Sequence, residues 1–132
     1  MKEMPDTKIP KGEQFYFENR VWERLLEFLK QENAFLKTRL AEVLDQSTDK
    51  GFLSLAEQFQ NKFILKDEFI DELRHDINTQ QRLLKENYIN PLSGLDKKII
   101  KNQEKLCNEM AFLEKDFPRM KNEFIQYLAG IA

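Results

Sequence analysis

The stretch AEQFQNKFILKDEFIDELRHDINTQQRLL, residues 56–84, decides the fold because it places an apolar side chain at every seventh position. These positions are Ala56, Phe63, Ile70, Ile77 and Leu84. A strand alternates every two residues, whereas an α-helix returns to nearly the same face after seven. The repeat therefore predicts a long helix that packs against partner helices through one seam.

The same seven-residue repeat continues on both sides of this stretch. Its members are Phe15, Trp22, Leu29, Leu36 and Val43 before it, and Leu92, Ile99, Leu106, Leu113, Met120 and Tyr127 after it. Further apolar residues widen the stripes: Val21, Leu25, Leu26, Phe28, Phe35 and Leu40 in the first segment, Leu55, Phe59, Phe69, Leu73 and Leu83 in the second, and Leu95, Met110, Phe117 and Phe124 in the third. Stripes this wide are typical of helices that contact two neighbours, so we expect these residues to face other helices.

Two short breaks separate the three segments, one near residues 46–51 and one at Asn90-Pro91-Leu92-Ser93-Gly94. We expect helices at about 13–46, 50–89 and 94–129 in a single domain, 13–132, preceded by a flexible tail, 1–12. Pro118 lacks a backbone N–H, so it predicts a kink in the third helix or a break that starts a fourth. The predicted fold is all-α: an elongated, antiparallel (up-down-up) three-helix bundle with left-handed, coiled-coil-like packing.

The charge balance narrows the classes of function. The 132 residues carry 21 basic and 23 acidic side chains, a net charge of −2, which argues against a nucleic-acid-binding protein. No run is apolar enough for a transmembrane helix or a signal sequence, so we expect no membrane partner. The one cysteine, Cys107, favours a reducing and hence cytoplasmic location.

Catalytic and metal-binding motifs are sparse. Glu72 and His75 have the Glu-x-x-His spacing of di-metal carboxylate bundles, and a metal-binding, ferritin-like bundle is the alternative function. Both residues, however, fall outside the seam, and His75 is the single histidine. Cys107 falls level with His75, but we expect a half-buried structural thiol rather than a nucleophile. We expect no enzyme activity and no cofactor.

Polar residues near the seam predict contacts that fix the register of the helices. They are Asn33, Lys66, Gln80 and Asn102. If the chain reverses direction at about residues 48 and 91, the antiparallel segments lie side by side. Lys66 is then level with Asp116, which predicts a partly buried ion pair. The same pairing brings the acidic run from Asp71 to Asp76 beside Arg20 and Arg24.

Some large apolar residues point away from the seam and are candidates for contacts with a protein partner. They are Ile64, Leu65, Tyr16, Phe17, Ile125 and Leu128. We therefore expect a non-enzymatic structural or protein–protein interaction module that acts through helical faces and self-associates, as a homodimer or another homo-oligomer.

The segments ENRVWERLLEFLKQENAFLKTRLAEVL (18–44) and AEQFQNKFILKDEFIDELRHDIN (56–78), with the string DELRHDIN, resemble a family of small bacterial helical proteins that has no assigned activity. The resemblance covers about half of the chain. It implies a helical fold in a bacterial cytoplasm and carries over no catalytic or binding residue.

Overall fold

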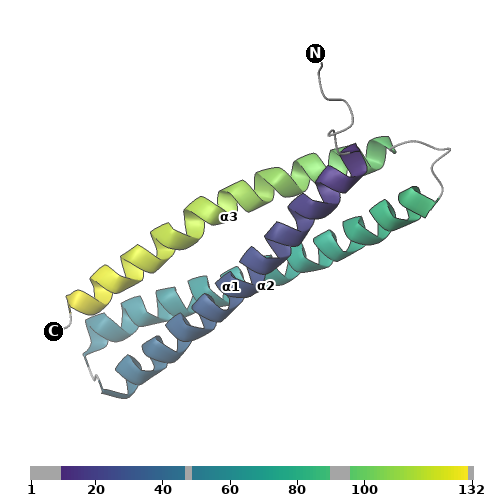
Figure 1. Ribbon diagram of the computed structural model, residues 1–132. Helices are drawn as coiled ribbons and strands as arrows, with labels where there is room; N and C mark the ends of the chain where they lie inside the picture. Colours follow the sequence, from purple (N-terminus) through teal and green to yellow (C-terminus); the bar gives the residue numbers. More distant parts are fainter. Residues whose placement is uncertain (1–9, 47–48, 90–95, 131–132) are drawn as a thin grey trace, which may run out of the picture.

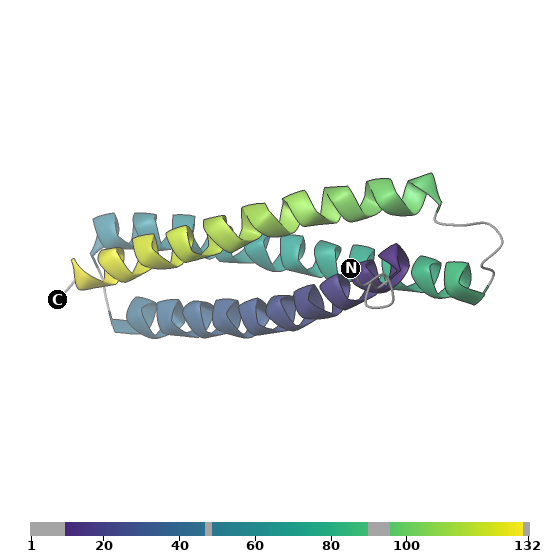
Figure 2. The same ribbon diagram turned by 45° about the horizontal axis from the view of Figure 1, so that its top comes forward.

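The computed structural model describes residues 10–46, 49–89 and 96–130, and no strand occurs among them. Three helices follow one another: α1 (Lys11–Gln46), α2 (Lys50–Ile89) and α3 (Lys97–Ala129). They run up, down and up along one elongated body (Figures 1 and 2). All three pairs of helices are in contact, which confirms the predicted all-α three-helix bundle.

Two helix starts are fixed by aspartate side chains. Asp49 Oδ1 accepts hydrogen bonds from the backbone N–H of Gly51, at 2.8 Å, and of Phe52, at 3.2 Å. Asp96 Oδ1 accepts from the Lys98 N–H at 2.9 Å, so it is the N-cap of α3. Each carboxylate satisfies N–H groups that have no partner inside the helix. The α1 helix includes Lys11 and Gly12, which were predicted to belong to the tail. Residues 1–9 of the predicted tail lie outside the described residues, and so do Leu92 and Leu95 of the predicted third apolar stripe.

Pro118 does not break the third helix. α3 continues through it to Ala129, so the predicted alternative of a separate fourth helix is wrong. Pro118 lies on the exposed side of α3, and so does Glu114, whose carbonyl loses its helical donor. Water can satisfy that carbonyl, and the packed side of the helix is left intact.

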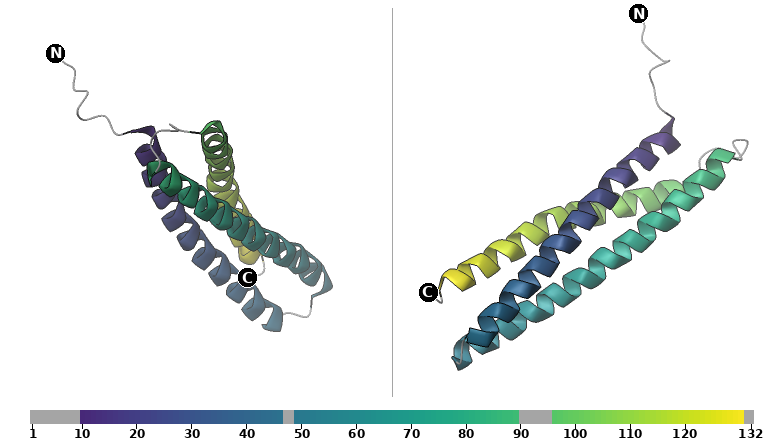
Figure 3. Two further views of the ribbon diagram at one scale, coloured as in Figure 1. Left: turned by 90° about the vertical axis from the view of Figure 1, so that its right-hand side faces the viewer. Right: turned by 60° about the horizontal axis from the view of Figure 1, so that its bottom comes forward.

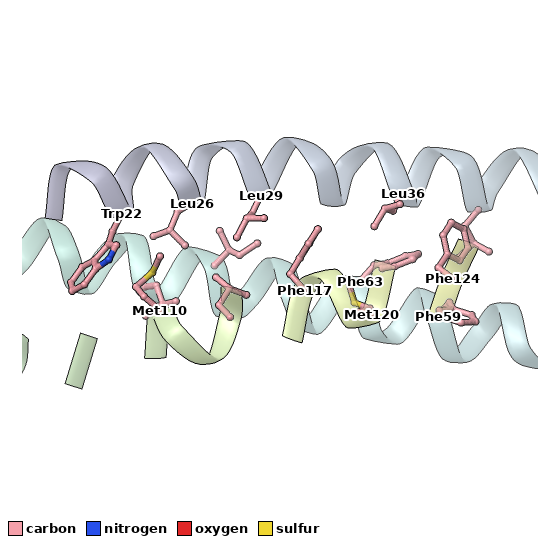
Figure 4. Packing of buried hydrophobic residues seen from close by; sticks show 14 of the residues in the cluster. Trp22, Leu26, Leu29, Leu36, Phe59, Phe63, Met110, Phe117, Met120 and Phe124 are labelled. Atoms are coloured by element: carbon pink, nitrogen blue, oxygen red, sulfur yellow. The ribbon is translucent and has the colours of Figure 1, made fainter. Parts of the chain in front are cut away.

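The core lies where the seven-residue rows of the three helices meet (Figure 4). Its members are Trp22, Leu26, Leu29, Leu36 and Leu40 from α1, Ala56, Phe59, Phe63, Ile70, Leu73 and Ile77 from α2, and Leu106, Met110, Leu113, Phe117, Met120 and Phe124 from α3. Because buried positions alternate at intervals of three and four residues, each helix presents one narrow face to its neighbours.

Aromatic rings fill the end of the core where α1 ends, α2 begins and α3 ends. The Phe63 and Phe124 rings meet edge to face at a centroid distance of 5.1 Å, and the Phe52 and Tyr127 rings stack at 4.9 Å. The Tyr127 hydroxyl donates to the Phe52 carbonyl at 2.7 Å. Burial raises the pKa of Tyr127 above its ordinary value.

The core is narrower than the sequence predicted. Val21, Phe28, Phe35 and Leu55 were expected to face other helices, but all four are exposed. Successive residues of a helix are about 100° apart, so Phe28 cannot share the buried direction of Leu29. In addition, α1 and α3 make the least extensive of the three helix contacts, and the two helices cross obliquely (Figure 3).

Candidate interaction surfaces

Buried amides link the three helices at the end opposite the aromatic rings. Gln103 Nε2 donates to Asn19 Oδ1 at 2.8 Å, and Gln80 Nε2 donates to Gln103 Oε1 at 3.0 Å. Gln80 Nε2 also reaches the Ile99 carbonyl at 2.8 Å, and Asn19 Nδ2 donates to Gln81 Oε1 at 2.9 Å. We call Asn19, Gln80 and Gln103 the amide layer. The sequence predicted Gln80 but missed Asn19 and Gln103, although both lie three or four residues from buried apolar positions.

Asn33 provides a second buried polar contact, between α1 and α2. Its Nδ2 donates to the Phe63 carbonyl and to Asp67 Oδ1, both at 2.8 Å. Burial by itself would raise the pKa of Asp67. Hydrogen bonds from Lys37 and Asn33, together with the charges of Lys37 and Lys30, outweigh burial and hold that pKa below its ordinary value.

The predicted pairing of the acidic run with Arg20 and Arg24 is wrong. Lys30 Nζ lies 3.0 Å from Asp71 and 3.6 Å from Asp67, and Arg20 pairs with Glu23 of its own helix. In an antiparallel pair, the chain reverses at the midpoint of two residues that lie level. The contact between residues 30 and 71 therefore means that the chain reverses at about residue 50, whereas residue 48 was predicted. α2 is therefore displaced along α1 by about one helical turn from the predicted register.

The predicted ion pair between Lys66 and Asp116 is confirmed. The two side chains are 12% and 13% exposed, so the pair is largely buried between α2 and α3, and Arg119 also binds Asp116. Burial would raise the pKa of Asp116, but the hydrogen bonds and charges of Lys66 and Arg119 lower it. Asn102, in contrast, is only partly buried.

A groove of about 400 Å³ lies between α2 and α3 around this ion pair. Its apolar lining includes Leu65, Phe69, Phe112 and Met120, and the Phe69 and Phe112 rings meet edge to face at 6.2 Å. The charged residues of the lining pair with one another: Lys66 and Arg119 with Asp116, and Lys62 with Glu123 at 3.7 Å. The groove therefore offers apolar contact rather than an unpaired charge to a ligand.

A line of exposed apolar side chains runs along the outside of α1. Phe17, Val21, Phe28 and Phe35 are 55%, 60%, 56% and 63% exposed, and the last three recur every seventh residue. We call these four residues the α1 outer stripe. The stripe lies beside the α1 residues that contact α3, which are Glu18, bound to Gln103, and Glu32, bound to Lys121. It lies away from Lys30 and Lys37, the α1 residues that bind α2.

The other predicted partner contacts are dispersed. Tyr16, Ile64, Leu65 and Ile125 are exposed, as expected from the sequence, but Leu128 is half-buried and packs against the core. Leu65 lines the groove, and the Tyr16 ring contacts the Phe17 ring edge to face at 5.8 Å. Of the six candidates, Phe17 thus belongs to the outer stripe and Leu65 to the groove.

Glu72 and His75 lie on the exposed side of α2. Among the described residues, no group of three or more histidine, cysteine, aspartate or glutamate side chains is arranged to hold a metal ion. Cys107 is exposed, so the prediction of a half-buried thiol is wrong. Lys121 lies two heptads after Cys107, and its Nζ binds Glu32 of α1 at 2.7 Å. Residues two heptads apart share one side of a helix, so Cys107 lies on the side of α3 that faces α1. His75 lies on the outer side of α2, away from Cys107.

Within the part of the chain that the structure describes, no helix is long and apolar enough to cross a membrane. In comparisons with known proteins, no family model, no curated protein and no solved structure matches this chain.

Proposed function

We propose that this protein is a non-enzymatic interaction module that self-associates through a helical face, with the α1 outer stripe as its contact surface. One observation carries the proposal: four large apolar side chains lie in a row on one helix, each more than half exposed. Apolar residues that are contiguous on a surface, unlike isolated ones, are typical of binding sites.

The extent of the stripe is suitable for a helix-to-helix contact. Phe17 and Phe35 are 18 residues apart, which corresponds to about 27 Å of helix. Complete burial of a Phe or Val side chain contributes roughly 1.5–3 kcal/mol, and about half of that remains to be gained at each exposed position. A partner helix that covers the stripe would therefore gain several kcal/mol, enough to offset part of the entropic cost of association.

The alternative functions have less support. The groove between α2 and α3 is open, and its charged groups form ion pairs within the chain, so it has less support as a site for chemistry than the outer stripe has as a contact surface. A metal-binding function rests on the Glu72–His75 spacing, to which the described residues add no third ligand.

The proposal is tested by light scattering on a gel-filtration column over a series of protein concentrations. The wild type is expected to approach twice 15.8 kDa, and Phe28→Glu is expected to remain at 15.8 kDa, because it places a charge in the middle of the contact. Phe112→Glu is the matched control: the same substitution at a phenylalanine that is equally exposed, 58% against 56%, but that lines the groove.

The control is expected to dimerise like the wild type. Circular dichroism should show the same helix content for all three proteins, since neither phenylalanine is in the core. A wild type that stays monomeric at the highest concentration, or a dimer that only Phe112→Glu disrupts, contradicts the proposal.

A further inference from the structure

We propose that the partner of the α1 outer stripe is the α1 helix of a second copy in antiparallel orientation, with the two-fold axis beside Phe28. Phe28 then packs against its symmetry mate, and Val21 of each copy packs against Phe35 of the other. This inference rests on the proposed function and adds to it the orientation and register of the pair.

The spacing of the stripe is compatible with two-fold symmetry. Val21 lies seven residues before Phe28, and Phe35 lies seven residues after it. A symmetric dimer requires a surface that is complementary to itself, and reversal of α1 about Phe28 exchanges Val21 with Phe35. A parallel pair would also align the apolar residues, so the apolar spacing alone does not select the orientation.

The residues at the two ends of the stripe select the antiparallel pair. Arg39 lies eleven residues after Phe28, close to three helical turns, and Phe17 lies eleven residues before Phe28. In an antiparallel pair, Arg39 of one copy therefore lies level with the Phe17 ring and next to Glu18 of the other copy, and the symmetry repeats this contact at the opposite end. In a parallel pair, Arg39 would instead lie beside its own symmetry mate and repel it.

The charged side chains are available for this contact. Glu18 is exposed, and Gln103 donates to its Oε1 at 2.8 Å, so the second carboxylate oxygen can accept from another donor. Arg39 is about half exposed and lies 3.6 Å from Glu42 of its own helix. An exposed pair of this kind within one helix is weak, so it leaves Arg39 able to turn toward a second copy.

The size of the contact suits a reversible dimer. The exposed parts of the four stripe residues amount to roughly 400 Å² of apolar surface per copy, if about 200 Å² is taken for a whole phenylalanine. With the flanking polar side chains, the pair would bury roughly 1,000–1,200 Å² in total, at the lower end of the range for specific interfaces. An interface of this size is typical of weak, reversible complexes, so we expect a dimer that dissociates on dilution.

Disulfide crosslinking tests the orientation. In a Cys107→Ser background, which removes the exposed native thiol, Val21→Cys and Phe35→Cys proteins are oxidised separately and as an equimolar mixture. The antiparallel pair predicts a disulfide mainly in the mixture, between the two different chains, which intact mass identifies. Disulfides that form mainly between identical chains would indicate a parallel pair and overturn the inference, although the proposed self-association would stand.

Charge reversal provides a second test that leaves the apolar residues in place. Glu18→Arg and Arg39→Glu are each expected to raise the dimer Kd by about 2- to 30-fold, because each removes an opposite-charge contact at both ends of the pair. The double variant restores opposite charges, so it should bind more tightly than either single variant. If it is no tighter than the single variants, the antiparallel register is wrong. If the parent protein is monomeric at all concentrations, the proposed function itself fails.

Discussion

The two ends of the bundle are held together by different chemistry. At one end, aromatic rings of α2 and α3 converge, with Phe63 and Phe124 completely buried and in contact at 5.1 Å. At the other end, the same seam carries the amides Asn19, Gln80 and Gln103, also buried, in a chain of hydrogen bonds. The heptad spacing is the same at both ends, so the difference lies in the side chains alone.

This difference separates stability from specificity. Apolar packing gains free energy wherever two surfaces meet, and it tolerates displacement of one helix along another. A buried amide costs free energy unless its partners lie at hydrogen-bonding distance, so the amide layer favours one register over its neighbours. We therefore expect the aromatic end to contribute more to stability than the amide end, and the amide end to contribute more to the choice of register.

The largest effect is expected at the aromatic end. Phe63→Ala should lower the free energy of unfolding by about 3–5 kcal/mol, because it leaves a cavity among the rings of Phe59 and Phe124. Phe112→Ala, at an exposed position, should lower it by less than about 1 kcal/mol. Urea denaturation measures both changes. Equal losses of unfolding free energy would show that Phe63 contributes no more to stability than an exposed phenylalanine.

A smaller effect is expected when the amide layer is broken. Gln103→Ala should lower the free energy of unfolding by about 1–3 kcal/mol, since Asn19 and Gln80 lose their shared partner inside the core. Replacing the whole layer is expected to have a different result. With Asn19→Leu, Gln80→Leu and Gln103→Leu together, the urea midpoint should stay the same or rise, because no buried donor or acceptor is left in the layer.

The triple leucine variant should nevertheless lose uniqueness of structure. Its amide proton–nitrogen NMR spectrum should show extra or broadened peaks from alternative registers, whereas the Phe63→Ala spectrum should keep one set of peaks. A single sharp set of peaks from the triple variant would mean that the apolar seam alone fixes the register, and that the contrast between the two ends does not hold.

The smallest expected effect is the dependence of the unfolding free energy on pH in the acid range. The pKa of Asp67 and of Asp116 is lowered in the folded protein, so both carboxylates bind protons less readily than in the unfolded chain. Their contribution is complete above the ordinary aspartate pKa of 3.8 and is lost as the pH falls through the lowered folded values. The unfolding free energy should therefore decrease in this window. Asp67→Asn with Asp116→Asn should make the decrease shallower, and an unchanged acid slope would contradict this account.

The predicted register is right for α2 with α3 and wrong for α1 with α2. A reversal of the chain at residue 91 predicted the contact between Lys66 and Asp116, and the structure confirms it. A reversal at residue 48 is wrong by about one helical turn, because Lys30 rather than Arg20 or Arg24 binds Asp71. Sequence periodicity is the same after a shift of one heptad, so it fixes which face of a helix is buried far better than the level at which two helices meet.

The missed residues have a common physical origin. Asn19 and Gln103 occupy buried positions of the seam, but the seven-residue apolar pattern does not mark these positions because both side chains are polar. Their spacing of three residues from Trp22 and from Leu106 is the signal that would have identified them. Val21, Phe28 and Phe35 show the converse error, because an exposed apolar row and a buried one have the same period.

The sequence by itself determined the number of helices, their antiparallel order and the row of each helix that is buried. These properties follow from the seven-residue period and the two breaks, which act locally along the chain. Only the tertiary structure decided that the second apolar row on α1 stays exposed, and which polar residues meet inside the core. Both depend on where α3 crosses α1 and on the level of α2 beside α1, which result from packing among all three helices together.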